Sequence, residues 1–162
     1  MPEHRPAFQS QRDEQHKVKA VLDTNVFVSG LMGVTSPPRQ IVDAWLDGQF
    51  TLVTSLYLVE ELAHVLSYPR IAERIHLDAS EVDVILAALL SQADVVPGEL
   101  QLPGATRDPR DDPVVACAVE SRADYLVSDH RDLLDLETDA GGTVVRPQRF
   151  LDILREEQEC HA

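Results

Sequence analysis

Short apolar runs with the length of strands alternate with amphipathic helical segments along nearly the whole chain, and this alternation limits the fold. Strands are expected at residues 17–22, 50–54, 95–96, 125–128 and 143–145. Ser36, Ser55 and Asp78 stand where helix N-caps are expected between them. Strands separated by helices form parallel sheets that are covered by helices on both faces. We therefore predict an α/β protein with three α/β/α layers and a parallel sheet of four to five strands.

The length and composition predict one globular domain. The chain has 162 residues, of which 44% are hydrophobic and 26% are charged, which is ordinary for a folded domain. We expect a disordered leader at 1–16, the domain at 17–154 and a C-terminal tail at 155–162. No run reaches the roughly 18 apolar residues of a membrane span. Cys117 and Cys160 match no metal-binding spacing, so a reduced, cytoplasmic protein is expected.

The charge balance restricts the partners. The chain carries 28 acids and 14 bases, a net charge of −14. Such a surface repels polyanions at long range, which argues against a non-specific DNA coat. A nuclease stays compatible with this charge, because carboxylates that hold cations are neutralised by them.

Several acids fall where an open parallel sheet places its sites. Asp23 follows the first strand, Asp129 follows the fourth, and Asp111 lies in the loop that opens a helix. Sites in such sheets form at the carboxyl ends of the strands. Like charges brought together there raise one another's pKa unless a cation lies between them. The sequence therefore predicts an acidic site at this edge.

Two pairs of adjacent acids occur in the chain, and in each pair one acid is the better candidate for the site. On the helix that begins after Ser55, Glu60 lies about 160° from the centre of the apolar stripe and Glu61 about 100°. Glu60 is therefore expected in solvent, and Glu61 on the rim, where it can lean over the strand ends. Asp112 precedes Pro113 and is predicted to be a helix N-cap. Asp111 has no such role and is the better ligand candidate, with Asp108 as a substitute.

Four segments of the chain carry a recognisable pattern, in order: Val21–Phe27, Glu61–Arg70, Arg107–Asp112 and Ala123–Leu134. In their residues and spacing these segments resemble the PIN-domain family. The resemblance is closest to the toxin components of toxin–antitoxin systems, which are similar to VapC.

The resemblance implies a metal-dependent ribonuclease on a sheet of order 3-2-1-4-5, with a cognate antitoxin as partner and self-association as a homodimer. It puts the acidic positions at Asp23, Glu61, Asp111 and the segment 128–132. The family has an Asp where this chain has His130. Either Asp129 substitutes for it, or His130 itself contacts water or metal, or that ligand is lost.

The resulting hypothesis is hydrolysis of RNA by metal-activated water, which leaves a 5′-phosphate and a 3′-hydroxyl. Oxygen-only ligands favour Mg²⁺ or Mn²⁺ over Zn²⁺. The candidate ligands are Asp23, Glu61 and Asp111, with Asp129 or Asp132 at the far edge; the first four are also the candidate catalytic residues. The candidate substrate-binding residues are Thr24, Asn25, Ser128, Arg107, Arg110 and Arg131.

Other classes of protein fit less well. The Asp23-Thr24-Asn25 segment also resembles the opening of haloacid-dehalogenase-like phosphatases, but the second Asp of that motif is Asn25 here. No lysine follows Lys19, whereas those phosphatases and receiver domains both need a later one. A PIN scaffold with weakened chemistry, acting as an RNA- or protein-binding regulatory module, stays open as the alternative.

Overall fold

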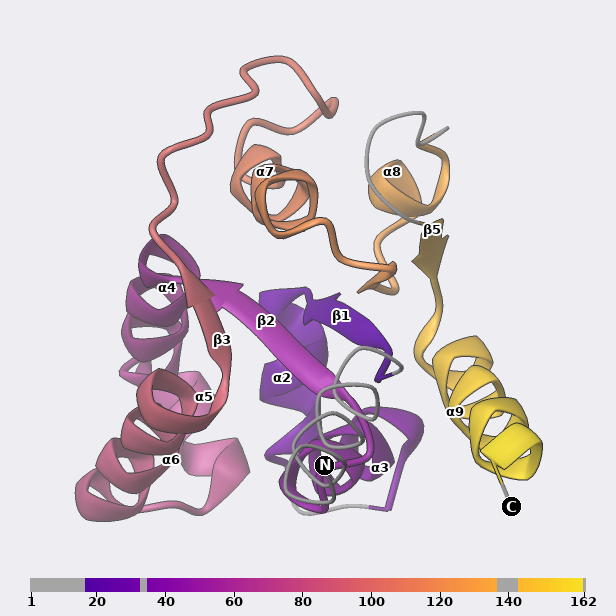
Figure 1. Cartoon of the computed structure of the whole chain (residues 1–162). Coiled ribbons are helices and arrows are strands. Elements are labelled where there is room, and N and C mark those ends of the chain that lie inside the picture. The colour runs from indigo at the N-terminus through magenta and orange to yellow at the C-terminus, as the bar shows by residue number, and fades with distance from the viewer. Residues whose placement is uncertain (1–16, 33–34, 137–142, 162) are drawn as a thin grey trace, which may run out of the picture.

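The computed structural model describes residues 17–32, 35–136 and 143–161 (Figure 1). The leader expected at 1–16 and the last residue of the expected tail lie outside the described residues. The elements, in chain order, are β1 (Lys19–Leu22), α2 (Thr24–Gly30), α3 (Pro37–Leu46), β2 (Thr51–Ser55), α4 (Leu56–Leu66), α5 (Pro69–Ile75), α6 (Ala79–Gln92), β3 (Asp94–Val96), α7 (Asp112–Ser121), β4 (Tyr125–Val127), α8 (Arg131–Leu134), β5 (Thr143–Val145) and α9 (Pro147–His161).

The five strands form one parallel sheet of order β3-β2-β1-β4-β5. This confirms both the α/β class and the strand order implied by the family resemblance. The central strand β1 lies between β2 and β4, so that Val21 is aligned with Val53 on one side and with Leu126 on the other. All carboxyl ends of the strands therefore meet at one edge.

Alternating side chains of the strands serve two separate cores. Ala20 and Leu22 pack with Val26 of α2, Ile41 of α3 and Phe150 of α9. The other face carries a second core, in which Val21 and Val53 pack with residues of α7 and with Leu133 of α8. Figure 1 shows α7 and α8 on one side of the sheet and α2, α3 and α9 on the other. The predicted three layers are therefore present.

The predicted caps begin the helices. The Ser36 hydroxyl accepts a hydrogen bond from the Arg39 N–H (3.4 Å), and the Ser55 hydroxyl accepts one from the Leu58 N–H (3.2 Å). Asp78 forms a capping box at the start of α6. These bonds satisfy donors that have no partner within a helix. Gly48, at a φ of +76°, follows the end of α3 in a backbone conformation that glycine adopts without strain.

Two helices carried no recognisable start signal. α2 begins directly after Asp23, and the Asp23 side chain makes no capping bond. α5 begins at Pro69, which the sequence pattern indicates as the end of the preceding helix, whereas it occupies the first turn of the next one. α9 continues past residue 154 through most of the segment expected as a tail. Among the described residues, no helix is long and apolar enough to cross a membrane.

Candidate metal centre

Asp23 ends the central strand and is held by the adjacent strand. Its N–H donates to the Val127 carbonyl (3.0 Å), which continues the pairing of β1 with β4. The hydroxyl of the fully buried Ser128 donates to Asp23 Oδ2 at 2.8 Å. The Asp23 residue is only 8% exposed. The carboxylate is therefore fixed in position by the backbone and by one side-chain bond.

The Asp23 carboxyl has a raised pKa in the folded protein. Burial raises the pKa of the Asp23 carboxyl, and the negative charge of Glu61 raises it further. The hydrogen bond from Ser128 and the proximity of His130 oppose this rise. A carboxylate with a raised pKa is stabilised when a positive charge is brought beside it. Its position favours binding of a cation.

Glu61 leans toward the same strand end, as helix geometry predicts. Glu60 is exposed and Glu61 is half-buried, which confirms the separation of the two. The Thr24 hydroxyl donates to Glu61 Oε2 at 2.8 Å. This bond joins the first residue of α2 to the second turn of α4, so a residue predicted to support the site orients one of its acids.

The structure corrects the helix-capping role that the sequence predicts for Asp112. Asp111, not Asp112, is the N-cap of α7, but its side chain makes no capping bond. The prediction that Asp112 caps the helix is wrong, because the helix already includes it and its carboxylate turns back to the preceding loop. It accepts hydrogen bonds from the Thr106 N–H (2.8 Å), the Thr106 hydroxyl (2.7 Å) and the Gly104 N–H (3.1 Å). Asp111 remains the carboxylate that is free for a ligand.

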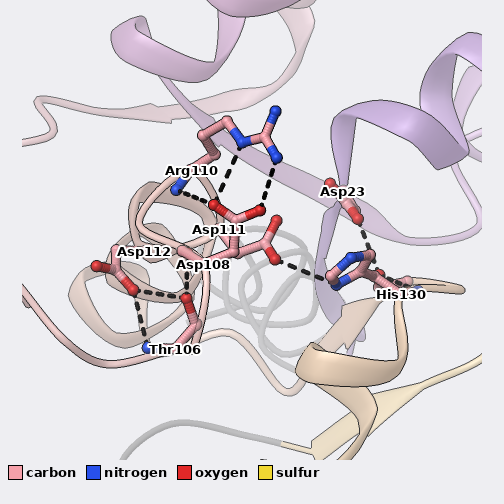
Figure 2. Close-up of polar contacts among 8 residues, drawn as sticks. Asp23, Thr106, Asp108, Arg110, Asp111, Asp112 and His130 are labelled. Carbon is pink, nitrogen blue, oxygen red and sulfur yellow. Dashed lines mark hydrogen bonds and ion pairs between the residues drawn. The ribbon is translucent and has the colours of Figure 1, made fainter.

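Asp111 faces the imidazole of His130. Asp111 Oδ2 and His130 Nδ1 lie 3.1 Å apart. Both atoms are enclosed by the protein, yet neither makes an aligned hydrogen bond with any residue that the structure describes. Figure 2 shows the carboxylate and the ring pointing toward each other. The 3.1 Å distance is a close polar contact that lacks the alignment of a hydrogen bond.

Asp132 completes a set of potential ligands, the ligand group of Asp111, His130 and Asp132. One donor atom from each residue lies within 4.8 Å of the other two. Burial raises the pKa of Asp111; His130 opposes the rise, whereas the charges of Asp23 and Asp132 add to it. This coupling puts Asp23 within electrostatic range of the group. The carboxylates and the enclosed, unpaired Oδ2 and Nδ1 atoms fit a divalent cation.

Asp129 lies outside this group in the described structure. Its side chain is exposed and forms an ion pair with Arg146 at 3.7 Å. His130 occupies the position facing Asp111 instead. Of the three possibilities open for this segment, the geometry favours direct participation of His130. The candidacy of Asp129 as a ligand stays a prediction with no contact to support it.

The candidate substrate-binding residues differ in their surroundings. Arg110 donates to both oxygens of Asp108, from Nε at 3.2 Å and from Nη2 at 3.0 Å (Figure 2). This pairing lowers the pKa of Asp108 and occupies the acid that could have replaced Asp111. Arg107, Arg131 and Asn25 are exposed. They stay candidates for substrate contact, and Arg110 must leave Asp108 to act in that way.

A cavity of about 280 Å³ lies beside the ligand group but does not contain it. It is lined by the loop at 98–109, by α7 and by Tyr57, and Asp112 rather than Asp111 reaches it. Cys117 also lines it, and burial raises the pKa of this thiol to about 12. The thiol is therefore protonated and unreactive at neutral pH.

Comparisons with known proteins agree with the geometry. A family model described as the PIN domain matches residues 19–132. The chain is also 27% identical over 123 residues to an uncharacterized protein of Methanocaldococcus jannaschii, MJ1680, a match that covers 76% of this chain and 77% of that protein. PIN domains are in general metal-dependent nucleases. The matched span contains Asp23, Glu61 and the ligand group, and the chain belongs to the PIN-domain family.

Proposed function

We propose that the protein is a metal-dependent endoribonuclease whose cation is held at the carboxyl edge of the sheet. The observation that carries the proposal is the convergence of acids from distant parts of the chain. Asp23 is coupled electrostatically to Glu61 and to Asp111, and Asp111 faces His130 and Asp132. Acids that raise one another's pKa cost folding stability, and a bound cation removes this cost.

The residues of this edge have distinct roles in the proposed reaction. Asp23 is the rigid ligand, because a strand end and Ser128 fix its carboxylate. Asp111 and Asp132 add carboxylate ligands from two other segments, and Thr24 orients Glu61 through its hydrogen bond. A bound divalent cation would lower the pKa of a water molecule and neutralise charge on the scissile phosphate. Water as the nucleophile leaves a 5′-phosphate and a 3′-hydroxyl.

The exposed arginines of this edge supply the contacts to RNA in the proposal. Guanidinium groups bind phosphate oxygens in pairs, which suits Arg107 and Arg131 to the backbone of the substrate. With a net charge of −14, the surface as a whole gives little non-specific attraction to RNA. We therefore expect local recognition of a particular RNA rather than indiscriminate binding.

The biological setting is proposed from the family resemblance. In this setting the protein is the toxin of a toxin–antitoxin pair, and it acts in the cytoplasm with a cognate antitoxin and as a homodimer. α6 supports a role in association: only Leu89 of this helix is buried, and Val84 and Leu90 are 68% and 51% exposed. Sedimentation of the purified chain, alone and after co-expression with its genomic neighbour, tests both associations.

The experiment for the activity itself is cleavage of mixed cellular RNA with Mg²⁺, with Mn²⁺ or with EDTA, followed by mapping of the 5′ ends. The proposal predicts cation-dependent cleavage, 5′-phosphate ends, and loss of cleavage in Asp23→Asn. Glu60→Gln is a matched control for Glu61→Gln, because Glu60 is exposed on the same helix. Unchanged cleavage by purified Asp23→Asn would remove the assignment.

A binding module without catalysis is the second candidate, and His130 is the observation that favours it. The family has an Asp at this position, so the chain lacks one oxygen ligand. RNA binding that is indifferent to EDTA, with no cleavage under any cation, supports this alternative. Binding and cleavage that both require the cation support the enzyme.

A further inference from the structure

An imidazole nitrogen lies among the candidate ligands of the site. The acids of the sequence by themselves predict a site of oxygen ligands only, for which Mg²⁺ and Mn²⁺ are about equally suitable. The structure adds an imidazole to it: His130 Nδ1 lies 3.1 Å from Asp111 Oδ2, and a donor atom of Asp132 lies within 4.8 Å of both residues' donors.

Backbone hydrogen bonds of His130 fix the position of the residue. The His130 N–H donates to the Ser128 hydroxyl at 2.9 Å, and that hydroxyl donates in turn to Asp23. The His130 carbonyl, at the N-cap of α8, accepts from the N–H groups of Leu133 (3.1 Å) and Leu134 (3.0 Å) in that helix. The imidazole itself makes no capping bond. Its position is therefore set by the backbone, and its ring is left free to bind a ligand.

The facing atoms lack the partner that their burial requires. A buried polar atom without a hydrogen bond is costly, so such atoms are rare in native proteins. Asp111 Oδ2 and His130 Nδ1 are both enclosed, and Oδ2 does not lie along the direction in which Nδ1 would donate a proton. One cation bound by both atoms would satisfy them together.

We propose that His130 Nδ1 is a metal ligand and that it makes the site selective for Mn²⁺ and later first-row divalent ions over Mg²⁺. Magnesium strongly prefers oxygen ligands and gives up its waters reluctantly. Imidazole binds transition ions well, and their affinity for mixed nitrogen and oxygen sites rises from Mn²⁺ through Co²⁺. The inference concerns the cation of the nuclease proposed above and so rests on that site, but it does not depend on RNA cleavage.

The test measures metal binding directly, without RNA. The full chain is freed of metal with a chelator, and Mn²⁺ and Mg²⁺ are titrated separately and in competition by calorimetry. Pulsed electron paramagnetic resonance of the Mn²⁺-loaded protein then detects coupling to a bound imidazole nitrogen. His130→Asp restores a carboxylate at the family's position. His76→Asn is the control, because His76 lies at the end of α5 with a φ of +54°, a conformation that Asn also adopts.

We expect Mn²⁺ to bind roughly tenfold or more tightly than Mg²⁺, with nitrogen coupling in the wild type and in His76→Asn. In His130→Asp the coupling should vanish and the preference for Mn²⁺ should fall by about tenfold. The absence of Mn²⁺ binding, binding without nitrogen coupling in the wild type, or an unchanged preference in His130→Asp overturns the inference. The wild-type spectrum decides the question even if His130→Asp does not fold.

Different experimental results would contradict the two proposals. Nitrogen-coupled Mn²⁺ binding by a protein that cleaves no RNA supports this inference and contradicts the nuclease. RNA cleavage that is equally fast with Mg²⁺ and Mn²⁺, with no nitrogen coupling, supports the nuclease and contradicts the role of His130.

Discussion

The hydroxyl of Ser128 donates a 2.8 Å hydrogen bond to the carboxylate of Asp23, a residue 105 positions earlier in the chain. The same hydroxyl accepts from the His130 N–H. One small buried side chain therefore connects the rigid ligand on β1 to the loop that carries the ligand group. Because β1 and β4 are neighbours in the sheet, this contact follows directly from the strand order.

Ser128→Ala should lower the rate of cleavage by roughly 10- to 100-fold, because it changes the position and the charge of the Asp23 carboxylate. Loss of the bond removes an interaction that lowers the pKa of Asp23. The acidic limb of the pH–rate profile should therefore move to higher pH. Ser128→Thr keeps the hydroxyl and should restore the wild-type profile. A parallel loss of activity at all pH values, with no recovery in Ser128→Thr, would show that Ser128 only fills space.

Asp23→Asn should lower the rate of metal-dependent cleavage by about 100-fold or more, while the protein stays folded. Asn retains a carbonyl oxygen that can accept from Ser128, so the buried hydrogen bond survives, but the amide is a poor metal ligand. Cleavage rates and circular dichroism are measured on the same preparation. Loss of activity together with loss of secondary structure would contradict this separation of roles.

The stability of the metal-free protein should depend on pH through Asp23. The pKa of Asp23 is raised in the folded state above 3.8, so the folded protein retains a proton that the unfolded chain has lost. This contribution to stability is fully present below pH 3.8 and disappears as the pH rises through the folded pKa. Asp78 and Asp112, whose carboxylates accept hydrogen bonds, have lowered pKa values and act in the opposite direction.

The difference between wild type and Asp23→Asn isolates this contribution. In EDTA at neutral pH, Asp23→Asn should be the more stable of the two in urea unfolding, and the gap should narrow toward low pH. Saturating Mn²⁺ should stabilise the wild type, by about 2.7 kcal/mol at a concentration of 100 times Kd, and should leave the variant less affected. A variant less stable than wild type in EDTA at neutral pH contradicts the electrostatic account.

Asp112→Ala should loosen the loop before α7 without removing a metal ligand. Three hydrogen bonds from Gly104 and Thr106 end on the Asp112 carboxylate. Their loss should speed amide exchange at residues 104 and 106, and should weaken RNA binding more than Mn²⁺ binding. Asp111→Ala is the comparison: it should weaken Mn²⁺ binding and leave exchange at these two amides unchanged. The same effect of both variants on metal affinity would mean that the two acids are not functionally separate.

Elements with their own local signals could be predicted from the sequence. The five strands are short apolar runs, and the caps Ser36, Ser55 and Asp78 are local hydrogen bonds whose partners lie three residues away. α2 was missed because its N-cap, Asp23, makes no capping bond. The other end of α2 packs closely on α3: a Cβ at Gly30 would lie 2.7 Å from Val42. Such contacts are non-local and leave no local pattern.

The residues of the candidate site also divide into those with a local sequence signal and those without one. Helix geometry correctly predicted that Glu60 is exposed and Glu61 half-buried, since both residues lie on α4. The capping role predicted for Asp112 from Pro113 was wrong, because the partners of its carboxylate, Gly104 and Thr106, lie in the preceding loop. Between Asp129 and His130, residue type favours the carboxylate, but the turn after β4 directs Asp129 toward Arg146 and His130 toward Asp111. Side-chain direction in an irregular turn cannot be derived from residue spacing.

The most direct test of the central claim is anomalous diffraction from crystals grown with Mn²⁺. Our account predicts a single strong manganese peak bound by Asp111 and His130, with Asp132 and Asp23 next to it either directly or through water. A peak elsewhere on the acidic surface, or no peak at saturating Mn²⁺ in crystals that keep this fold, would contradict the account.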